Sequence, residues 1–224
     1  MNKTKKYIHG LLKALAIGIL LTSCDAHIEF PDTNMQPCHI LCTDGKVVTI
    51  DQCEAQGRSP IGVVFYVNQG GSEEHEGTGY AVYLWDIAPE MFADSLGVKQ
   101  NTSASLTKYD GNSNTFAIYN TRDMGSPLAD AVFAIWRYGQ SAYIPSVAQM
   151  QLLYRAKASV NAYIKRCGGD PIPDEPDKCW YWTSTEVSGQ ESAKAWLYSL
   201  SSGAMQETPK DQAHKARPII TLYQ

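Results

Sequence analysis

The chain has 224 residues and a formal net charge of −4, a length that allows one domain of ordinary size and a short targeting segment. Residues 1–24 contain four lysines and no acidic residue, so the remaining chain carries a formal net charge of −8. A chain with this charge lacks the basic surface that nucleic acid phosphates require, and we expect no nucleic acid partner. It also lacks the positive charge that would hold it on anionic lipid.

Residues 1–24 are expected to be a signal peptide for export. Three lysines precede an apolar stretch, residues 11–21, which is too short for a comfortable membrane span. The stretch ends in Leu21-Thr22-Ser23-Cys24, which resembles the lipobox of bacterial lipoproteins. That resemblance implies cleavage before Cys24, its lipidation, and attachment to the cell envelope through the lipid. We expect an outer-membrane location facing the periplasm or the cell surface; an ordinary signal peptide or a poor membrane helix are the alternatives.

Residues 25–37 contain two prolines and few apolar residues, and are expected to form a tether. A single domain, residues 38–224, follows. Its N-terminal strands are expected within residues 46–85, in three short apolar or β-branched runs at 46–50, 61–67 and 80–85, separated by turn signals.

Residues 88–125 have the composition of loops. Asp110, Asn112 and Asn114 imitate the first ligands of a calcium loop, but the required glycine and glutamate further along are replaced by Thr115 and Thr121. We therefore expect a solvated turn there. The charged cluster at residues 73–76 is likewise expected to be a solvated loop tip.

Two helices are expected next, at residues 126–138 and 146–167. The first opens on Ser126 followed by a proline at its first helical position. The second opens on a capping box made by Ser146 and Gln149, and two glycines follow its end. Both show apolar residues at helical spacing, and a strand at 142–144 is expected between them.

The C-terminal part, residues 179–223, is expected to be an antiparallel sheet centred on the aromatic run 179–186. Strand alternation places Trp180 and Trp182 on one face and Tyr181 on the other. We expect further strands at 194–200, 204–208 and 217–223, with a hairpin at 201–203.

Five cysteines follow Cys24, at positions 38, 42, 53, 167 and 179. Cys167 and Cys179 flank a Gly/Pro/Asp loop, and in an exported protein we expect a disulfide between them. The other three leave an odd thiol under any pairing. A zinc site competes with this reading, but the spacing is a poor match, and neither a metal nor a cofactor is predicted.

The order of elements and the residues themselves resemble the bacterial C-type-lectin-like domains found at the C-terminus of collagen-like surface adhesins, relatives of the formylglycine-generating-enzyme fold. The resemblance covers residues 120–222 and implies an α+β, C-type-lectin-like fold: two helices packed on a twisted antiparallel sheet, with long irregular loops. The matching segments are Tyr143-Ile144-Pro145-Ser146, Gln149, Leu152-Leu153, Gly168-Gly169, Tyr181–Glu186, Ala195-Trp196, Gly203, Lys215 and Arg217-Pro218. The strand at 60–65 is also similar to an N-terminal part of gut-bacterial members.

The chain departs from the enzymes and from the sugar-binding lectins of this group. The Arg-Gly-Gly-Ser-Trp type of segment and the active-site cysteine pair of formylglycine-generating enzymes are missing, as are the Glu-Pro-Asn and Trp-Asn-Asp calcium motifs of lectins. The histidines lie in no local catalytic motif. These absences favour binding over catalysis.

We therefore expect a lipid-anchored surface module for adhesion or ligand binding, which contacts a protein or a glycan through loops beside the C-terminal sheet. The candidate contact residues are Trp180, Ser188, Gln190, Glu191, Ser192, Trp196, Gln206 and Lys210. A structural accessory or tip subunit of a surface fibre is one alternative. An enzyme related to the formylglycine generator, with a reactive thiol at Cys53 or Cys167, is the other.

A second set of residues is expected to act structurally: Tyr143, Pro145, Ser146, Trp182, Ser184, Thr185, Glu186 and Arg217. We expect the side chains of residues 183–186 to bond to the backbone and to Arg217 or Lys215, which would fix the sheet to the core. A rim of the ligand site is the alternative role for this segment.

Overall fold

The computed structural model describes residues 34–70, 72–135 and 141–223. Residues Asn34–Gln224 form one compact unit, so the domain includes residues 34–37 of the expected tether. Met35 packs against a buried cluster of the sheet. The signal peptide, the lipidation candidate Cys24 and the rest of the tether lie outside the described residues. None of the helices in the described part has the length and apolar composition of a membrane span.

The domain is α+β, as predicted, with antiparallel strand pairing in three sheets. The elements in chain order are β1 (Ile40–Cys42), β2 (Val47–Val48), α2 (Ile50–Ala55), β3 (Pro60–Val67), β4 (Gly79–Tyr83), β5 (Ile87–Met91), α3 (Gly111–Tyr119), α4 (Pro127–Ala134), β6 (Ala142–Tyr143), α5 (Val147–Arg166), η2 (Pro176–Lys178), β7 (Trp180–Glu186), β8 (Lys194–Ser199), β9 (Met205–Pro209), β10 (Ala213–Ala216) and β11 (Ile219–Leu222).

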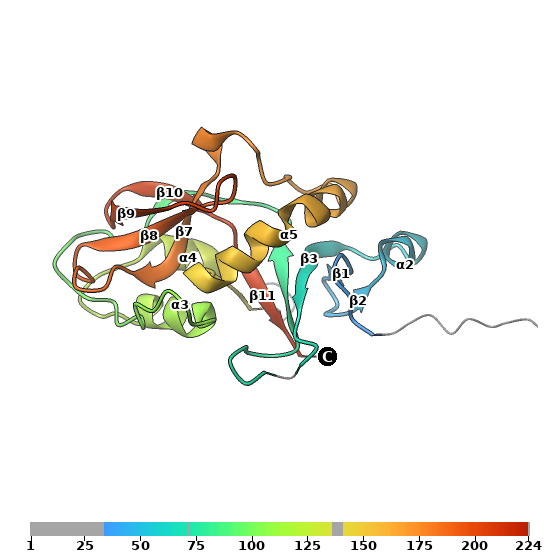
Figure 1. Cartoon of the computed structure of the whole chain (residues 1–224), viewed down its shortest axis with the longest axis horizontal. Helices are drawn as coiled ribbons and strands as arrows, with labels where there is room; N and C mark the ends of the chain where they lie inside the picture. Colours follow the sequence, from blue (N-terminus) through green and yellow to red (C-terminus); the bar gives the residue numbers. More distant parts are fainter. Residues whose placement is uncertain (1–33, 71, 136–140, 224) are drawn as a thin grey trace, which may run out of the picture. The chain divides into compact units, whose positions relative to one another are not determined.

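The largest sheet has six strands in the order β2-β1-β3-β4-β11-β6. The last strand of the chain, β11, lies between β4 and β6, so the two ends of the domain share one sheet (Figure 1). Helix α5 packs on β3, and the buried side chains of the two elements belong to one core cluster (Figure 1). Burying this apolar face removes it from water, which is the main force that holds the helix on the sheet.

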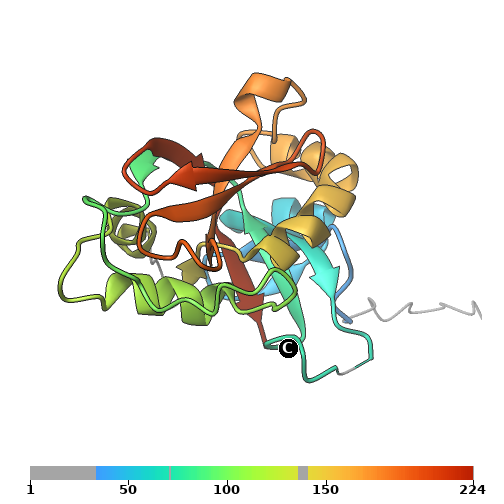
Figure 2. The same ribbon diagram turned by 60° about the vertical axis from the view of Figure 1, so that its left-hand side comes forward.

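The other two sheets are the three-stranded β7-β8-β9 and the two-stranded β10-β5. Figure 2 shows β7 to β10 in orange to dark red, with the green β5 beside β10. The buried Trp182 of β7 donates its indole N–H to the Glu90 carbonyl of β5 at 3.0 Å, and its ring contacts Phe92 at 5.5 Å between centroids. Trp182 therefore joins the two small sheets.

The long helix and the aromatic strand follow the predicted local signals. Ser146 and Gln149 form the predicted capping box at the start of α5. The two predicted helices are confirmed with shorter bounds, and residues 136–138 of the first lie outside the described residues. Strands β3, β4, β7, β8, β9 and β11 are confirmed within one or two residues of most predicted ends.

The predicted solvated turn at 110–114 is wrong, because this segment begins helix α3. Asn114 is buried, and its side-chain oxygen accepts from the Ser103 amide at 3.0 Å. The Thr115 hydroxyl donates to the Gly111 carbonyl at 2.7 Å and accepts from the Ile144 amide at 2.9 Å. These tertiary partners offset the weak helix propensity of asparagine and threonine.

The predicted disulfide between Cys167 and Cys179 is not seen, and the five cysteines of the described residues, Cys42 and Cys53 included, are all free thiols. The loop between them folds back on its surroundings: the Asp170 amide donates to the Leu84 carbonyl at 2.9 Å, and the Asn161 side chain bonds to both backbone groups of Ile172. Cys179 then donates its thiol proton to the Pro173 carbonyl. These contacts direct the two cysteines to separate places.

A buried ion pair holds the irregular segment before α3. Glu186, at the end of β7, and Lys210, after β9, are almost fully buried and lie 2.9 Å apart. The Glu186 carboxylate also accepts from the Gln100 amide at 2.8 Å and from the Thr102 hydroxyl at 3.0 Å. The Lys210 ammonium completes its set of three donors with the Val98 carbonyl and the Gln100 side chain. The pair thus ties two strand ends to residues 98–102.

Replacement of Lys210 by methionine should reduce the free energy of unfolding by about 3 kcal/mol, because it leaves a buried carboxylate without its counter-charge. The control is Lys194→Met, which removes a half-exposed ion pair with Glu207 and should cost less than about 1 kcal/mol. Urea unfolding of the three proteins measures both effects. Equal losses in the two variants would contradict the structural role given to the buried pair.

Candidate functional site

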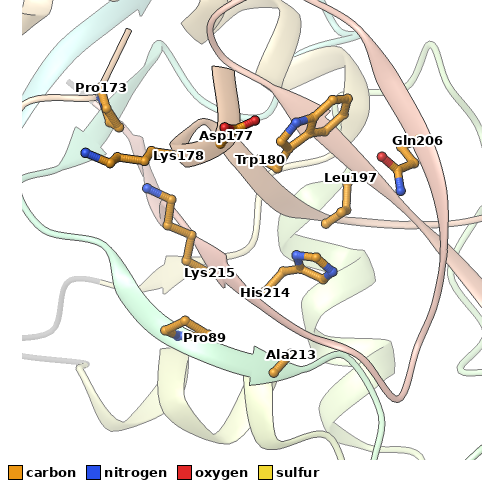
Figure 3. A pocket seen from close by; sticks show the side chains of 10 residues that line it. All are labelled: Pro89, Pro173, Asp177, Lys178, Trp180, Leu197, Gln206, Ala213, His214 and Lys215. Atoms are coloured by element: carbon orange, nitrogen blue, oxygen red, sulfur yellow. The ribbon is translucent and has the colours of Figure 1, made fainter. Parts of the chain in front are cut away.

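One concave surface lies where the small sheets meet, and we call it the Trp180 groove. It has a volume of about 460 Å³, and Figure 3 shows its wall. The lining residues come from β5, the loop that leads into η2, and strands β7 to β10. They are Pro89, Pro173, Asp177, Lys178, Trp180, Leu197, Gln206, Ala213, His214 and Lys215. The volume lies within the usual range of small-molecule sites.

Trp180 supplies the aromatic surface of the groove. Strand alternation sets Trp180 and Trp182 on the same side of β7, where Trp182 is fully buried and Trp180 is half-buried against the same core cluster. Leu197 lies opposite Trp182 on β8, and Gln206 lies opposite Leu197 on β9. In Figure 3 the Trp180 ring lies above Leu197 and His214, with Gln206 at its side. The groove therefore combines a flat apolar ring with a nearby side-chain amide.

His214 adds a second polar group. It pairs with Glu90 across β10 and β5, and its ring meets the Trp182 ring edge to face at 5.3 Å between centroids. Burial lowers the pKa of His214 below its usual 6.5. The imidazole is thus neutral at pH 7 and offers one hydrogen-bond donor and one acceptor.

The two lysines of the groove are compensated by acidic neighbours. Lys215 pairs with Asp86 at 3.0 Å and lies 4.3 Å from the centroid of the Tyr181 ring. Asp86 also forms an ion pair with the buried Arg217, whose other guanidinium nitrogens donate to the Tyr83 and Asp170 carbonyls. Lys178 lies 3.5 Å from Glu175. The wall of the groove consequently contains charged, polar and apolar side chains.

The chemistry available in the groove is stacking and hydrogen bonding. Its lining contains no serine, threonine or cysteine that His214 could activate as a nucleophile. The amide of Gln206 and the imidazole of His214 can both donate and accept, which suits hydroxyl-bearing ligands. The groove can therefore hold such a ligand by stacking on Trp180 and by hydrogen bonds to these two side chains.

Of the predicted contact residues, only Trp180 and Gln206 line this groove. Ser188, Gln190, Glu191 and Ser192 lie in the turn after β7, at the opposite end of the hairpin from Trp180. There Glu191 pairs with Lys99 at 3.3 Å, and its acceptance of the Gly189 amide lowers its pKa. Trp196 is half-buried and packs against the core cluster on the other face of β8.

The prediction that Lys210 contacts a ligand is wrong. Its side chain is fully buried, and all three ammonium donors are used within the domain. Lysine side chains are rarely buried unless a counter-charge lies beside them. The expected position of Lys210 in a loop therefore suggested that its side chain is exposed. The ion pair with Glu186 could be found only from the fold.

The expected partners of residues 183–186 are partly wrong. Thr183 donates to the Trp196 carbonyl at 2.9 Å, and Thr185 accepts from the Val147 amide at 3.2 Å, so bonding to the backbone does occur. Glu186, however, pairs with Lys210, whereas Arg217 and Lys215 pair with Asp86. The Ser184 amide donates to the Pro145 carbonyl, which joins β7 to the start of α5.

The remaining structural residues form a buried network beside α5. Tyr143 accepts from the Gln149 side chain at 3.0 Å and bonds to the Thr221 hydroxyl at 2.8 Å. Burial raises the pKa of Tyr143 well above its usual value. Ser146 donates to the Lys108 carbonyl at 2.8 Å. This network links β6, α5 and β11.

Sequence reasoning missed most of the groove. Strands β5 and β10, which were not predicted, supply Pro89, His214 and Lys215. The Gly/Pro/Asp loop between Cys167 and Cys179, for which no site was predicted, supplies Pro173, Asp177 and Lys178. Strand β10, Ala213–Ala216, carries no alternation, because His214 and Lys215 lie side by side between two alanines. Only its pairing with β5 marks it as a strand.

A second concavity of about 600 Å³ lies between residues 73–76 and 107–110. His75 stacks on Tyr109 at 3.8 Å between ring centroids and bonds to the Tyr66 hydroxyl at 3.0 Å. Glu76 accepts from the side chain of Asn112 at 3.3 Å. Residues 73–76 were expected to be a solvated loop tip, but His75 and Glu76 are half-buried and fix the loop to α3.

The depressed pKa of His214 gives a pH prediction. Between pH 6.5 and the lower folded-state pKa, the unfolded chain binds a proton at this position that the folded chain does not. The free energy of unfolding is therefore highest above pH 6.5, where His214 is neutral in both states. It decreases as the pH falls below 6.5, because the unfolded chain then takes up the proton more readily. Urea unfolding between pH 7.5 and 5 should show a smaller acid loss in His214→Gln than in the unmodified chain. An NMR titration midpoint of His214 at or above 6.5 would contradict this.

The comparisons with known proteins add no relative to this description. No protein-family model matches the chain, and a search of the curated proteins finds no match.

Proposed function

We propose that the chain is a lipid-anchored binding module with a C-type-lectin-like fold, which recognises a ligand through the Trp180 groove. The observation that carries this proposal is a half-buried tryptophan in a groove of about 460 Å³, beside an amide and a neutral imidazole. An apolar ring face with a few polar groups around it is the usual composition of a recognition site.

The fold part of the proposal is supported by the order of elements. The three-stranded sheet β7-β8-β9 follows helix α5, and the last strand β11 returns to pair with β4 near the start of the domain. This agrees with the sequence resemblance at residues 143–146 and 181–186. The α+β class is common to many folds, so the finer assignment stays a proposal.

A glycan is the ligand that the groove favours. A sugar ring offers an apolar face for Trp180 and hydroxyl groups for Gln206 and His214, which can each donate and accept. The two lysines of the groove are already paired, Lys178 with Glu175 and Lys215 with Asp86, so neither requires an anionic ligand. A protein loop that presents a small polar side chain is the other class of ligand.

The Cys167 thiol favours binding over the enzyme alternative. Burial raises the pKa of Cys167 to about 11. A thiol with such a pKa is almost fully protonated at pH 7 and is a poor nucleophile.

The alternative of a fibre accessory or tip subunit would be supported by co-purification with a polymeric assembly.

The test of recognition is a screen of residues 25–224 on glycan and protein arrays, followed by measurement of Kd for any ligand found. Trp180→Ala should weaken binding at least about fivefold, because truncation of an aromatic anchor typically costs more than about 1 kcal/mol. The matched control is Trp196→Ala, which removes a half-buried tryptophan from the other face of β8 and should leave Kd within about twofold. Equal weakening by both, or hydrolase or oxidase activity without binding, would contradict the proposal.

The anchor has its own test. Cys24→Ala removes the residue that the lipobox resemblance marks for acylation, and the variant should leave the membrane fraction. Metabolic labelling with a fatty acid should mark the unmodified chain and not the variant. Retention of the variant in the membrane would contradict a lipid anchor.

A further inference from the structure

Two buried thiols lie in contact at the N-terminal end of the domain. Cys42 ends β1 and Cys53 lies in the short helix α2, and their Sγ atoms are 3.8 Å apart. The exposed fraction is 1% for Cys42 and 2% for Cys53, and both belong to the main core cluster. The contact is therefore built into the packing of α2 on β1.

The surrounding structure fixes both side chains. Thr49 and Gln52 form a capping box that starts α2, so the helix directs its two buried residues, Ile50 and Cys53, into the core. Strand β1 is paired on both sides, with β2 and with β3. The Cys53 thiol also donates to the Arg58 carbonyl at 3.6 Å. Neither residue can leave the contact without disturbing an element.

We propose that Cys42 and Cys53 form a disulfide bond in the mature protein, which links β1 to α2. A disulfide brings its sulfur atoms to about 2.05 Å, so the pair must close by less than 2 Å, a movement that side-chain rotation can supply. The proposal is independent of ligand binding. It requires an oxidising compartment, which export to the envelope would supply.

The reaction needs an oxidant, and we infer a disulfide-bearing one, either a small molecule or a protein. One cysteine thiolate attacks the oxidant's disulfide and releases one thiolate from it, leaving a mixed disulfide. The second cysteine thiolate then attacks the mixed disulfide and releases the other. Overall the two thiols lose two protons and two electrons, one S–S bond forms in the protein, and one S–S bond of the oxidant is reduced to two thiols.

The protonation state of Cys42 indicates when this reaction takes place. Because burial and the neighbouring Cys53 raise the pKa of Cys42 to about 12, its thiolate is rare in the folded domain. Pairing should therefore occur while the segment is still open during folding, where a loop of about ten residues closes rapidly. Once formed, the bond is shielded from reductants by the same burial.

Other partners for these thiols are less well placed. Burial, followed by the neighbouring Cys53, raises the pKa of Cys167 to about 11, but the two sulfur atoms in contact are those of Cys42 and Cys53. Across residues 34–70, 72–135 and 141–223, no three His, Cys, Asp or Glu side chains are grouped to hold a metal ion. The pair is thus better explained as a disulfide than as part of a metal site.

The test is a peptide map of the full chain. The chain is purified in detergent, reduced and unfolded, and then refolded with oxidised and reduced glutathione. After alkylation and trypsin digestion without reduction, Cys53 lies alone in the peptide 47–58, whereas Cys42 shares the peptide ending at Lys46 with Cys24 and Cys38. These two peptides should be recovered as one linked species. The link should persist in Cys38→Ser and disappear in Cys42→Ser. Recovery of both thiols alkylated or separately glutathionylated, or a link from Cys53 to Cys38 or Cys167, would overturn the proposal.

Stability gives a second readout. The oxidised chain should unfold about 5 °C above the reduced chain, since closing a short loop typically adds a few kcal/mol. This dependence on reduction should vanish in Cys53→Ser and remain in Cys179→Ser, which removes a different buried cysteine. A redox shift that persists in Cys53→Ser would overturn the assignment. The peptide map on the unmodified chain decides the pairing where a variant does not fold.

Discussion

The ion pair between Glu186 and Lys210 is the constraint on which the second half of the domain depends. Moving each of these charges out of water costs several kcal/mol, and the cost is offset only when every donor and acceptor finds a partner. The partners are the backbone of residues 98–102 and the side chains of Gln100 and Thr102. The irregular segment before α3 is therefore required for β7 and β9 to end where they do.

A second set of charges acts on the other side of the same strands. Asp86 lies between Lys215 and Arg217, and Arg217 reaches the carbonyls of Tyr83 and Asp170. The buried pair fixes the ends of β7 and β9, while the Asp86 group fixes β10 against β5. Lys215, which Asp86 holds, is part of the wall of the Trp180 groove. A site with rigid walls loses little conformational freedom when a ligand binds, which favours affinity from few contacts.

The elements that could be predicted are those with local signals. The capping box of α5, the apolar run of β3 and the alternation of β7 are each contained in fewer than ten consecutive residues, and they specify the α+β class. Helix α3 and strands β5 and β10 were missed because tertiary hydrogen bonds and a distant partner strand stabilise them. Four of the ten residues that line the groove come from β5 and β10, and only Trp180 and Gln206 were named from sequence.

The aromatic strand β7 serves both the scaffold and the groove because its alternation separates the two roles. Tyr181 and Trp182 are fully buried on opposite faces, and Trp180 stands at the strand's first position, where the sheet edge leaves its ring half-open.

The end of the domain that contains residue 34 lies beside β1 and α2, across the molecule from β9 and β10 (Figure 1). A mechanical force applied through an N-terminal anchor would thus act on β1 first. A link between Cys42 and Cys53 would strengthen the domain at that end, while the groove faces away from it.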